Sequence, residues 1–130
     1  MPERDDNLPY AIEVSVDTQF VVEQSQPEAD RYVFAYTITL RNVGGVPARL
    51  LSRHWVITDA NGKIEEVRGD GVVGEQPRLQ PGEGYSYTSG AVLATSVGTM
   101  RGEYYLHADD GTDFETPIPE FVLSVPRTLH

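Results

Sequence analysis

Side chains alternate between apolar and more polar types through much of this 130-residue chain. The clearest case is the segment 31–42, where every second residue is a large apolar one: Tyr32, Phe34, Tyr36, Ile38 and Leu40. Successive side chains of a β-strand point to opposite faces, so a period of two predicts a strand with one buried face. No segment carries a convincing apolar stripe at the 3.6-residue period of a helix. This pattern limits the chain to an all-β fold.

The same alternation predicts further strands, separated by turn residues. They fall at 10–17 (extending to or bending at 20–22), 48–58, 63–68, 85–89, 100–108 and 113–123. Asp59–Gly62 and Asp109–Thr112 have the composition of hairpin turns, whereas 23–30 reads as a loop and 91–98 as less regular. Pro117 and Pro119 remove ladder donors, which predicts an edge strand or one bulged between its halves. About seven short strands at this spacing predict an antiparallel β-sandwich.

Trp55, the only tryptophan, lies in the third predicted strand. A buried tryptophan there is typical of immunoglobulin and fibronectin type III sandwiches, and the absence of cysteine favours the fibronectin-like variant. We expect Trp55 to lie between the sheets with Tyr36, Ile38 and Ile57 among its neighbours. Strict alternation puts Leu51, Arg53, Trp55 and Ile57 on one face and Leu50, Ser52, His54 and Val56 on the other. His54 is therefore predicted to be a solvated or rim histidine.

The charge balance bears on which partners the chain can bind. It has 20 acidic and 10 basic residues, a net charge of −10, which repels the phosphates of nucleic acids. No apolar run approaches the roughly 20 residues that span a bilayer, and the N-terminus lacks an export signal. We therefore expect a soluble, cytoplasmic monomer without membrane insertion. A flexible arm (1–9), one domain (10–125) and a tail (126–130) are predicted.

The hexapeptide Gly69–Gly74 has the spacing G-x-G-x-x-G within a predicted long loop, 69–84. A dinucleotide site of this kind needs a helix directly after the glycines, because the helix N-terminus supplies the amides that hold phosphate. Pro77 and Pro81 prevent such a helix, and no Lys-Ser/Thr follows as in a P-loop. Long loops on a rigid sandwich often carry recognition. We therefore predict a partner-binding loop with these candidate residues: Arg68, Gly69, Asp70, Gly71, Gly74, Glu75, Gln76 and Arg78.

Other candidate chemistry is weakly supported by the sequence. His54, His107 and His130 share no metal-ligand spacing, and Asp109, Asp110 and Asp113 surround an ordinary hairpin turn. No serine lies in a nucleophile elbow, and there is no cysteine to act as a thiolate. We therefore predict no catalytic residue, no metal ligand and no cofactor.

Several runs together resemble the ApaG family. In chain order they are Ser52–Trp55, Asp59–Lys63, Val67–Pro77, Leu79–Gly82, Tyr87–Gly90, Gly98–Gly102 and Ile118–Phe121, and the resemblance extends over 12–123. It implies an immunoglobulin/fibronectin-like sandwich. It also implies, for bacterial members, an association with cobalt and magnesium resistance or efflux by an undefined mechanism. Similar domains of eukaryotic F-box proteins and of a polymerase-delta-interacting protein look like protein-interaction modules. The family supplies no established catalytic residues.

Two functions are compatible with these observations. The favoured one is a non-catalytic, protein-interaction module that docks a protein partner through a sheet face or the loop-rich end. The alternative is a protein that binds a nucleotide, pyrophosphate or a divalent cation through Gly69–Gly74 or the acidic turns.

Overall fold

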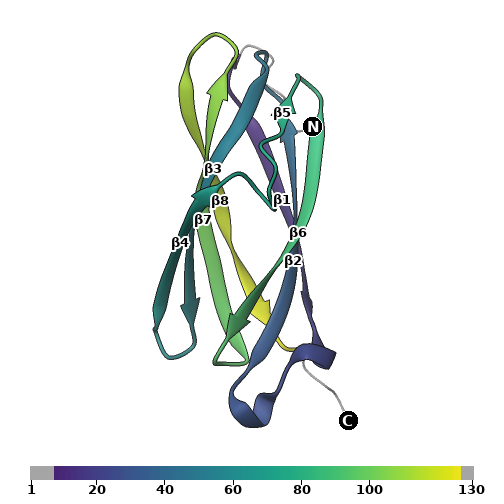
Figure 1. Ribbon diagram of the computed structural model, residues 1–130, viewed down its shortest axis with the longest axis vertical. Coiled ribbons are helices and arrows are strands. Elements are labelled where there is room, and N and C mark those ends of the chain that lie inside the picture. Colours follow the sequence, from purple (N-terminus) through teal and green to yellow (C-terminus); the bar gives the residue numbers. More distant parts are fainter. Residues whose placement is uncertain (1–7, 127–130) are drawn as a thin grey trace.

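Two antiparallel sheets face each other in the computed structural model, which describes residues 8–126 (Figure 1). One sheet has the order β1-β2-β6; the other has the order β4-β3-β7-β8, with β5 also pairing with β3. The elements are β1 (Ile12–Phe20), η1 (Val22–Gln24), η2 (Pro27–Ala29), β2 (Tyr32–Asn42), β3 (Ala48–Asp59), β4 (Ile64–Asp70), β5 (Arg78–Leu79), β6 (Gly84–Leu93), β7 (Val97–Ala108) and β8 (Asp113–Ser124). The predicted fibronectin-like sandwich is confirmed, with the two-residue β5 as an eighth strand.

Three segments differ from the sequence-based prediction. The predicted loop 23–30 contains two short 3₁₀ helices, η1 and η2. The stretch 91–98, predicted to be less regular, is irregular only at 94–96, because β6 runs to Leu93 and β7 begins at Val97. The prediction of one long loop over 69–84 is also wrong, since β4 runs to Asp70 and β5 lies within the segment.

The ends of the described chain are bonded to the fold. The carbonyls of Leu8 and Pro9 accept hydrogen bonds from the amides of Gly45 and Val46. The rest of the predicted arm, residues 1–7, and most of the predicted tail, residues 127–130, lie outside the described residues. No helix in the described part of the chain is long and apolar enough to cross a membrane.

A β-bulge in β3 changes which of its side chains enter the core. The register with β7 shifts between Leu50 and Ser52, so Leu51 is the extra residue. Leu50 is fully buried and shares the core with Trp55, although strict alternation put them on opposite faces. The predicted placement of Leu51 on the same face as Trp55 is therefore wrong, because period-two reasoning cannot count a bulge.

The predicted edge strand is confirmed at β8, which is the last strand of its sheet. Its register with β7 shifts between Met100 and Gly102, opposite the stretch from Ile118 to Phe121. Both Ile118 and Phe121 pack into or against the core despite their odd spacing. Pro117 and Pro119 thus stand beside the bulge, where missing ladder donors cost least.

The core lies between the two sheets, and Trp55 is at its centre. The indole is only 2% exposed and contacts Tyr36, Phe121 and Tyr104, with ring centroids 5.4, 5.9 and 6.4 Å away. All three contacts are T-shaped, a favourable arrangement for aromatic rings. The predicted burial of Trp55 against Tyr36 is confirmed.

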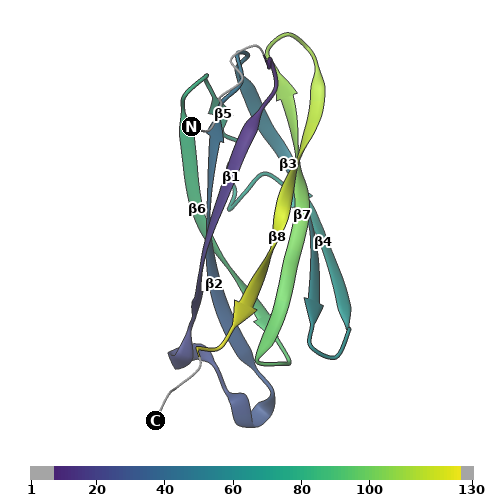
Figure 2. The same ribbon diagram turned by 180° about the vertical axis from the view of Figure 1, so that it is seen from behind.

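The sandwich has two open sides, because neither sheet closes on itself. Figure 1 looks onto the side bounded by β4 and β6, which the connection from β4 to β5 crosses. Figure 2 looks onto the opposite side, where β1 and β8 lie next to each other. The predicted partner-binding loop therefore lies on the open side between β4 and β6.

Candidate interaction site

The glycine hexapeptide folds into the end of β4 and a small hairpin. Val72 and Glu75 exchange backbone hydrogen bonds, with N–O distances of 2.8 and 3.0 Å. Between them, Val73 and Gly74 both have positive φ, 49° and 80°. Two such residues between bonded ends form a type I′ turn. We call the four residues Val72–Glu75 the tip hairpin.

Buried contacts hold the tip hairpin against β3. The side chain of Val72 is fully buried in the core. The Arg53 guanidinium donates from Nη1 to the carbonyls of Asp70 (3.0 Å) and Gly71 (2.7 Å). At the far end, Arg49 Nη1 donates to the carbonyl of Gln76 at 2.7 Å. Two arginines of β3 therefore fix both ends of the hairpin.

The bulge residue Leu51 supplies the remaining anchor. Its carbonyl accepts hydrogen bonds from the Gly71 amide (2.8 Å) and from Gln76 Nε2 (2.9 Å). Gly71 is required here, since its φ is 62° and a Cβ would lie 2.4 Å from the Glu75 carbonyl oxygen. Alternation placed the Leu51 side chain on the same face as Trp55; in the structure the Leu51 carbonyl anchors the hairpin.

The exposed tip consists mainly of Val73 and its neighbours. Val73 is 60% exposed at φ 49°, a conformation that β-branched residues rarely adopt. Among the described residues, the only other non-glycine residue with positive φ is Asp30, a type that tolerates it. Gly74 and Glu75 are exposed beside Val73, and Asp70 is exposed at the end of β4. An apolar side chain thus stands at the end of a firmly held loop.

The structure separates the predicted loop residues into three groups. Asp70, Gly74 and Glu75 are exposed at or next to the tip hairpin, as an interaction loop requires. Gly69, Gly71 and Gln76 have structural contacts; a Cβ on Gly69 would lie 2.9 Å from the Arg53 guanidinium. The two arginines point elsewhere, Arg78 to an ion pair with Asp109 and Arg68 to the outer sheet face. The sequence did not single out Val73, although Val-Gly in a two-residue turn is an unusual combination.

Backbone amides of the hexapeptide and of the residue after it donate to carbonyls of the fold. Those of Gly71, Val72 and Glu75 donate to the carbonyls of Leu51, Glu75 and Val72 respectively. The segment after Gly74 leads into the strand β5 rather than into a helix. The hexapeptide therefore lacks the helix N-terminus that binds pyrophosphate in dinucleotide sites.

The acidic turn near β8 is likewise engaged by its own neighbours. Asp109 pairs with Arg78, and Asp110 accepts a hydrogen bond from the Tyr10 hydroxyl at 2.5 Å. Asp113 Oδ1 lies 2.6 Å from His107 Nδ1. The Arg78 guanidinium lowers the pKa of Asp109. Within residues 8–126, no three histidine or acidic side chains are grouped so that they could hold a metal ion.

His54 is held between two carboxylates on the outer face of the larger sheet. Its Nδ1 lies 2.5 Å from Glu103 Oε1, and its Nε2 lies 2.7 Å from Glu66 Oε1. The Tyr105 hydroxyl donates to the same Glu103 oxygen at 2.8 Å. The sequence predicted a solvated or rim histidine; His54 is only 8% exposed, so the solvated role is wrong. Strands β4 and β7 flank β3 and bring both glutamates alongside the ring.

These contacts predict how stability depends on pH. Hydrogen bonds to Glu103 and then Glu66 raise the pKa of His54 above 6.5, and the bond to His54 lowers the pKa of Glu103 below 4.5. The contribution of His54 to the free energy of unfolding is therefore fully present below pH 6.5 and is lost as pH rises through its folded pKa. The Glu103 contribution is present above pH 4.5 and is lost as pH falls through its folded pKa.

We expect the difference in melting temperature between the wild type and His54→Gln to be larger at pH 6 than at pH 9. Calorimetry at both values measures it, with His107→Gln as the control on an exposed histidine of the same sheet. A difference between the wild type and His54→Gln that is the same at both pH values would contradict the charged pairing.

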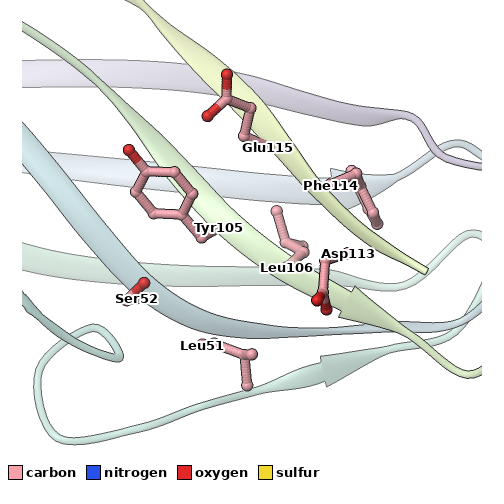
Figure 3. Close-up of a pocket in the computed structure, with 7 residues that line it drawn as sticks. All are labelled: Leu51, Ser52, Tyr105, Leu106, Asp113, Phe114 and Glu115. Atoms are coloured by element: carbon pink, nitrogen blue, oxygen red, sulfur yellow. The ribbon is translucent and has the colours of Figure 1, made fainter. Parts of the chain in front are cut away.

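A shallow depression of about 470 Å³ lies on the same outer face, over β3, β7 and β8 (Figure 3). Its lining residues are Leu51, Ser52, Tyr105, Leu106, Asp113, Phe114 and Glu115. Leu51 thus lines this depression with its side chain while its carbonyl anchors the tip hairpin. The depression is open to solvent, and Ser52, Tyr105, Asp113 and Glu115 supply its polar lining.

Comparisons with known proteins agree on one family. The sequence pattern of a family described as the ApaG domain matches residues 22–108. A protein named Protein ApaG from Dechloromonas aromatica is 62% identical over 125 residues, covering 96% of this chain and 98% of the relative. Its namesake from Xanthomonas campestris pv. campestris is 60% identical over the same length and coverage. A crystal structure of a Bordetella pertussis protein superposes with a TM-score of 0.91 and 52% identity, covering 94% of this chain and 99% of that one.

Proposed function

The chain belongs to the ApaG domain family, and we propose that it is a non-catalytic protein-interaction module that docks its partner through the tip hairpin. In this account the molecule is cytoplasmic and has no reaction of its own. The association with cobalt and magnesium resistance or efflux, which the family resemblance implies, runs through the partner protein.

The observation that carries this proposal is the conformation of Val73. A valine at positive φ costs free energy, on the order of 1–3 kcal/mol for a strained backbone position, and asparagine or glycine would avoid much of it. The side chain is 60% exposed, so packing within the chain offsets little of this cost. Strain of this kind concentrates at functional positions. An apolar contact with a partner is a reason to keep valine there.

The way the hairpin is held supports the same function. Arg53, Arg49 and the buried Val72 hold the backbone on both sides of the tip. A loop that is already ordered loses less conformational entropy when it docks. The exposed carboxylates of Asp70 and Glu75 on either side of Val73 would favour basic groups at the rim of the partner surface.

We expect Val73→Asn to raise the stability of the protein by about 0.5–2 kcal/mol while weakening partner capture at least about tenfold. The gain in stability is expected because asparagine suits the first central position of a type I′ turn. Thermal unfolding measures stability, and quantitative affinity capture from the native organism measures binding. The matched control is Val122→Asn, an exposed valine (54%) on β8.

The two measurements separate function from folding. Loss of capture without loss of stability places the contact at the tip hairpin. If Val73→Asn retains every protein that the wild type captures, or if Val122→Asn loses the same ones, the tip hairpin is not the docking site.

A further inference from the structure

Strand β6 forms an edge of the smaller sheet and is bordered only by β2. Its ten residues contain no charged side chain and no proline. Its pairing with β2 runs without a register shift from Tyr32↔Leu93 to Arg41↔Gly84. Natural proteins usually protect edge strands with charges, prolines or bulges, because a bare edge pairs readily with another strand. The edge of β6 has none of these protections.

The other edge strands do carry such protection. In β8 it is the two prolines at 117 and 119 together with the register shift. In β4, Glu65 pairs with Ile57 on the inner face, and a charge pointing inward discourages strand addition. Strand β1 carries Glu13 and Asp17 and lies next to β8. The contrast singles out β6, which borders the open side seen in Figure 1.

The register defines which backbone groups of β6 are free. Residues opposite each other in an antiparallel pair exchange hydrogen bonds at every second position. The Asn42 amide donates to the Glu83 carbonyl, so the bonded pairs continue through Tyr85, Tyr87, Ser89 and Ala91. The amides and carbonyls of Ser86, Thr88, Gly90 and Val92 therefore point away from β2. All four of these residues are exposed.

The surroundings of this edge leave room for another strand. On the outer face, Ser86, Thr88 and Gly90 have small or absent side chains. On the inner face, a small hollow of about 50 Å³ separates the end of β6 from the β3–β4 hairpin. Leu93 and Ile57 form apolar walls of this hollow, Asp59 and Glu65 supply two carboxylates, and Lys63 supplies one ammonium group, so the lining is acidic on balance. A lysine or arginine side chain at the mouth of this hollow would rest its stem on the apolar walls and place its charged head at the carboxylates.

We propose that β6 pairs with an extended, basic segment of another protein, which adds a strand to the smaller sheet. Main-chain hydrogen bonds to Ser86, Thr88 and Gly90 hold the segment, and a lysine or arginine on its inner face meets Glu65. Charge decides the choice of occupant, since a second copy of this chain brings a further net charge of −10 to the interface. The proposed contacts, Ser86, Thr88, Gly90 and Glu65, include no residue of the tip hairpin, so either proposal can fail without the other.

The probe is a synthetic nine-residue peptide of alternating lysine and valine, compared with one of alternating glutamate and valine. We expect the basic peptide to shift the amide NMR signals of Ser86, Thr88 and Gly90 saturably and to bind at least about tenfold more tightly than the acidic one. Binding should weaken with added salt, because the attraction is between exposed charges. Protection of the same amides from hydrogen exchange would establish strand pairing.

Matched variants test the two contacts separately. Thr88→Pro removes an outward amide from β6, whereas Thr18→Pro does the same on β1, another edge strand; only the first should abolish binding. Glu65→Gln should weaken binding of the basic peptide severalfold. Glu115→Gln, which changes an exposed glutamate of β8, should leave that binding unchanged. Glu65→Gln leaves the backbone untouched, so it remains informative if the proline variants do not fold.

Several outcomes would overturn the proposal. They are equal binding of the two peptides, signal shifts on β1 instead of β6, and unchanged affinity in Glu65→Gln. Sedimentation that shows the free protein dimerising with its β6 amides protected would also overturn it, because a second copy would then be the occupant.

Discussion

Trp55→Ala is expected to lower the free energy of unfolding by about 3–5 kcal/mol, the range for removing a large aromatic from a core. The indole is 2% exposed and packs edge-on against Tyr36, Tyr104 and Phe121. These three rings come from β2, β7 and β8, so the tryptophan joins both sheets. Its removal leaves a cavity that none of these strands can close without moving from its partner.

Urea unfolding monitored by circular dichroism measures this change. The control is Val122→Ala, a half-exposed valine that should change stability by less than about 0.5 kcal/mol. A loss below about 1 kcal/mol for Trp55→Ala would mean that the indole does not hold the two sheets together.

Gly102→Ala is expected to be nearly as damaging, with a loss of about 3 kcal/mol or more, at or beyond the upper end for overpacked cores. A Cβ at this position would lie 1.9 Å from the carbonyl oxygen of His54 and 3.2 Å from the Cα of Trp55. Both are backbone atoms, so no side-chain rotation relieves the clash. Strands β3 and β7 would have to separate at the centre of the larger sheet.

Gly90→Ala is the matched control, since it also adds a methyl group to a strand glycine. The nearest atom to its Cβ is the Phe34 carbonyl oxygen at 3.4 Å, an ordinary contact. We expect less than about 1 kcal/mol of change by the same unfolding measurement. Equal losses of unfolding free energy in the two variants would show that β3 and β7 can separate at Gly102 at little cost.

Local alternation was enough to predict most of the fold. In β2 the five large apolar residues face the core as the period-two pattern requires, and Trp55 lies between the sheets. The prediction failed where one strand gains a residue relative to its neighbour. Leu51 is such an extra residue, and a bulge depends on the pairing of β3 with β7, which no local pattern encodes.

The candidate site was predictable only in part, for a similar reason. The glycines and prolines between β4 and β6 correctly indicated a segment without a helix. The anchors of that segment, Arg49, Arg53 and the Leu51 carbonyl, come from β3, some 17 to 27 residues away in sequence. The pairing of His54 with Glu66 and Glu103 likewise needs the order β4-β3-β7, which becomes visible only in the folded sheet.

The central claim, that the tip hairpin docks a protein partner, is tested most directly by photo-crosslinking inside living cells. A photoreactive amino acid replaces Val73 in one strain and Val122 in another; both positions are exposed, 60% and 54%. We expect discrete crosslinked species from position 73 that are absent from position 122 and that disappear when unlabelled wild-type protein competes. Crosslinks that are the same from both positions, or none from position 73, would contradict it.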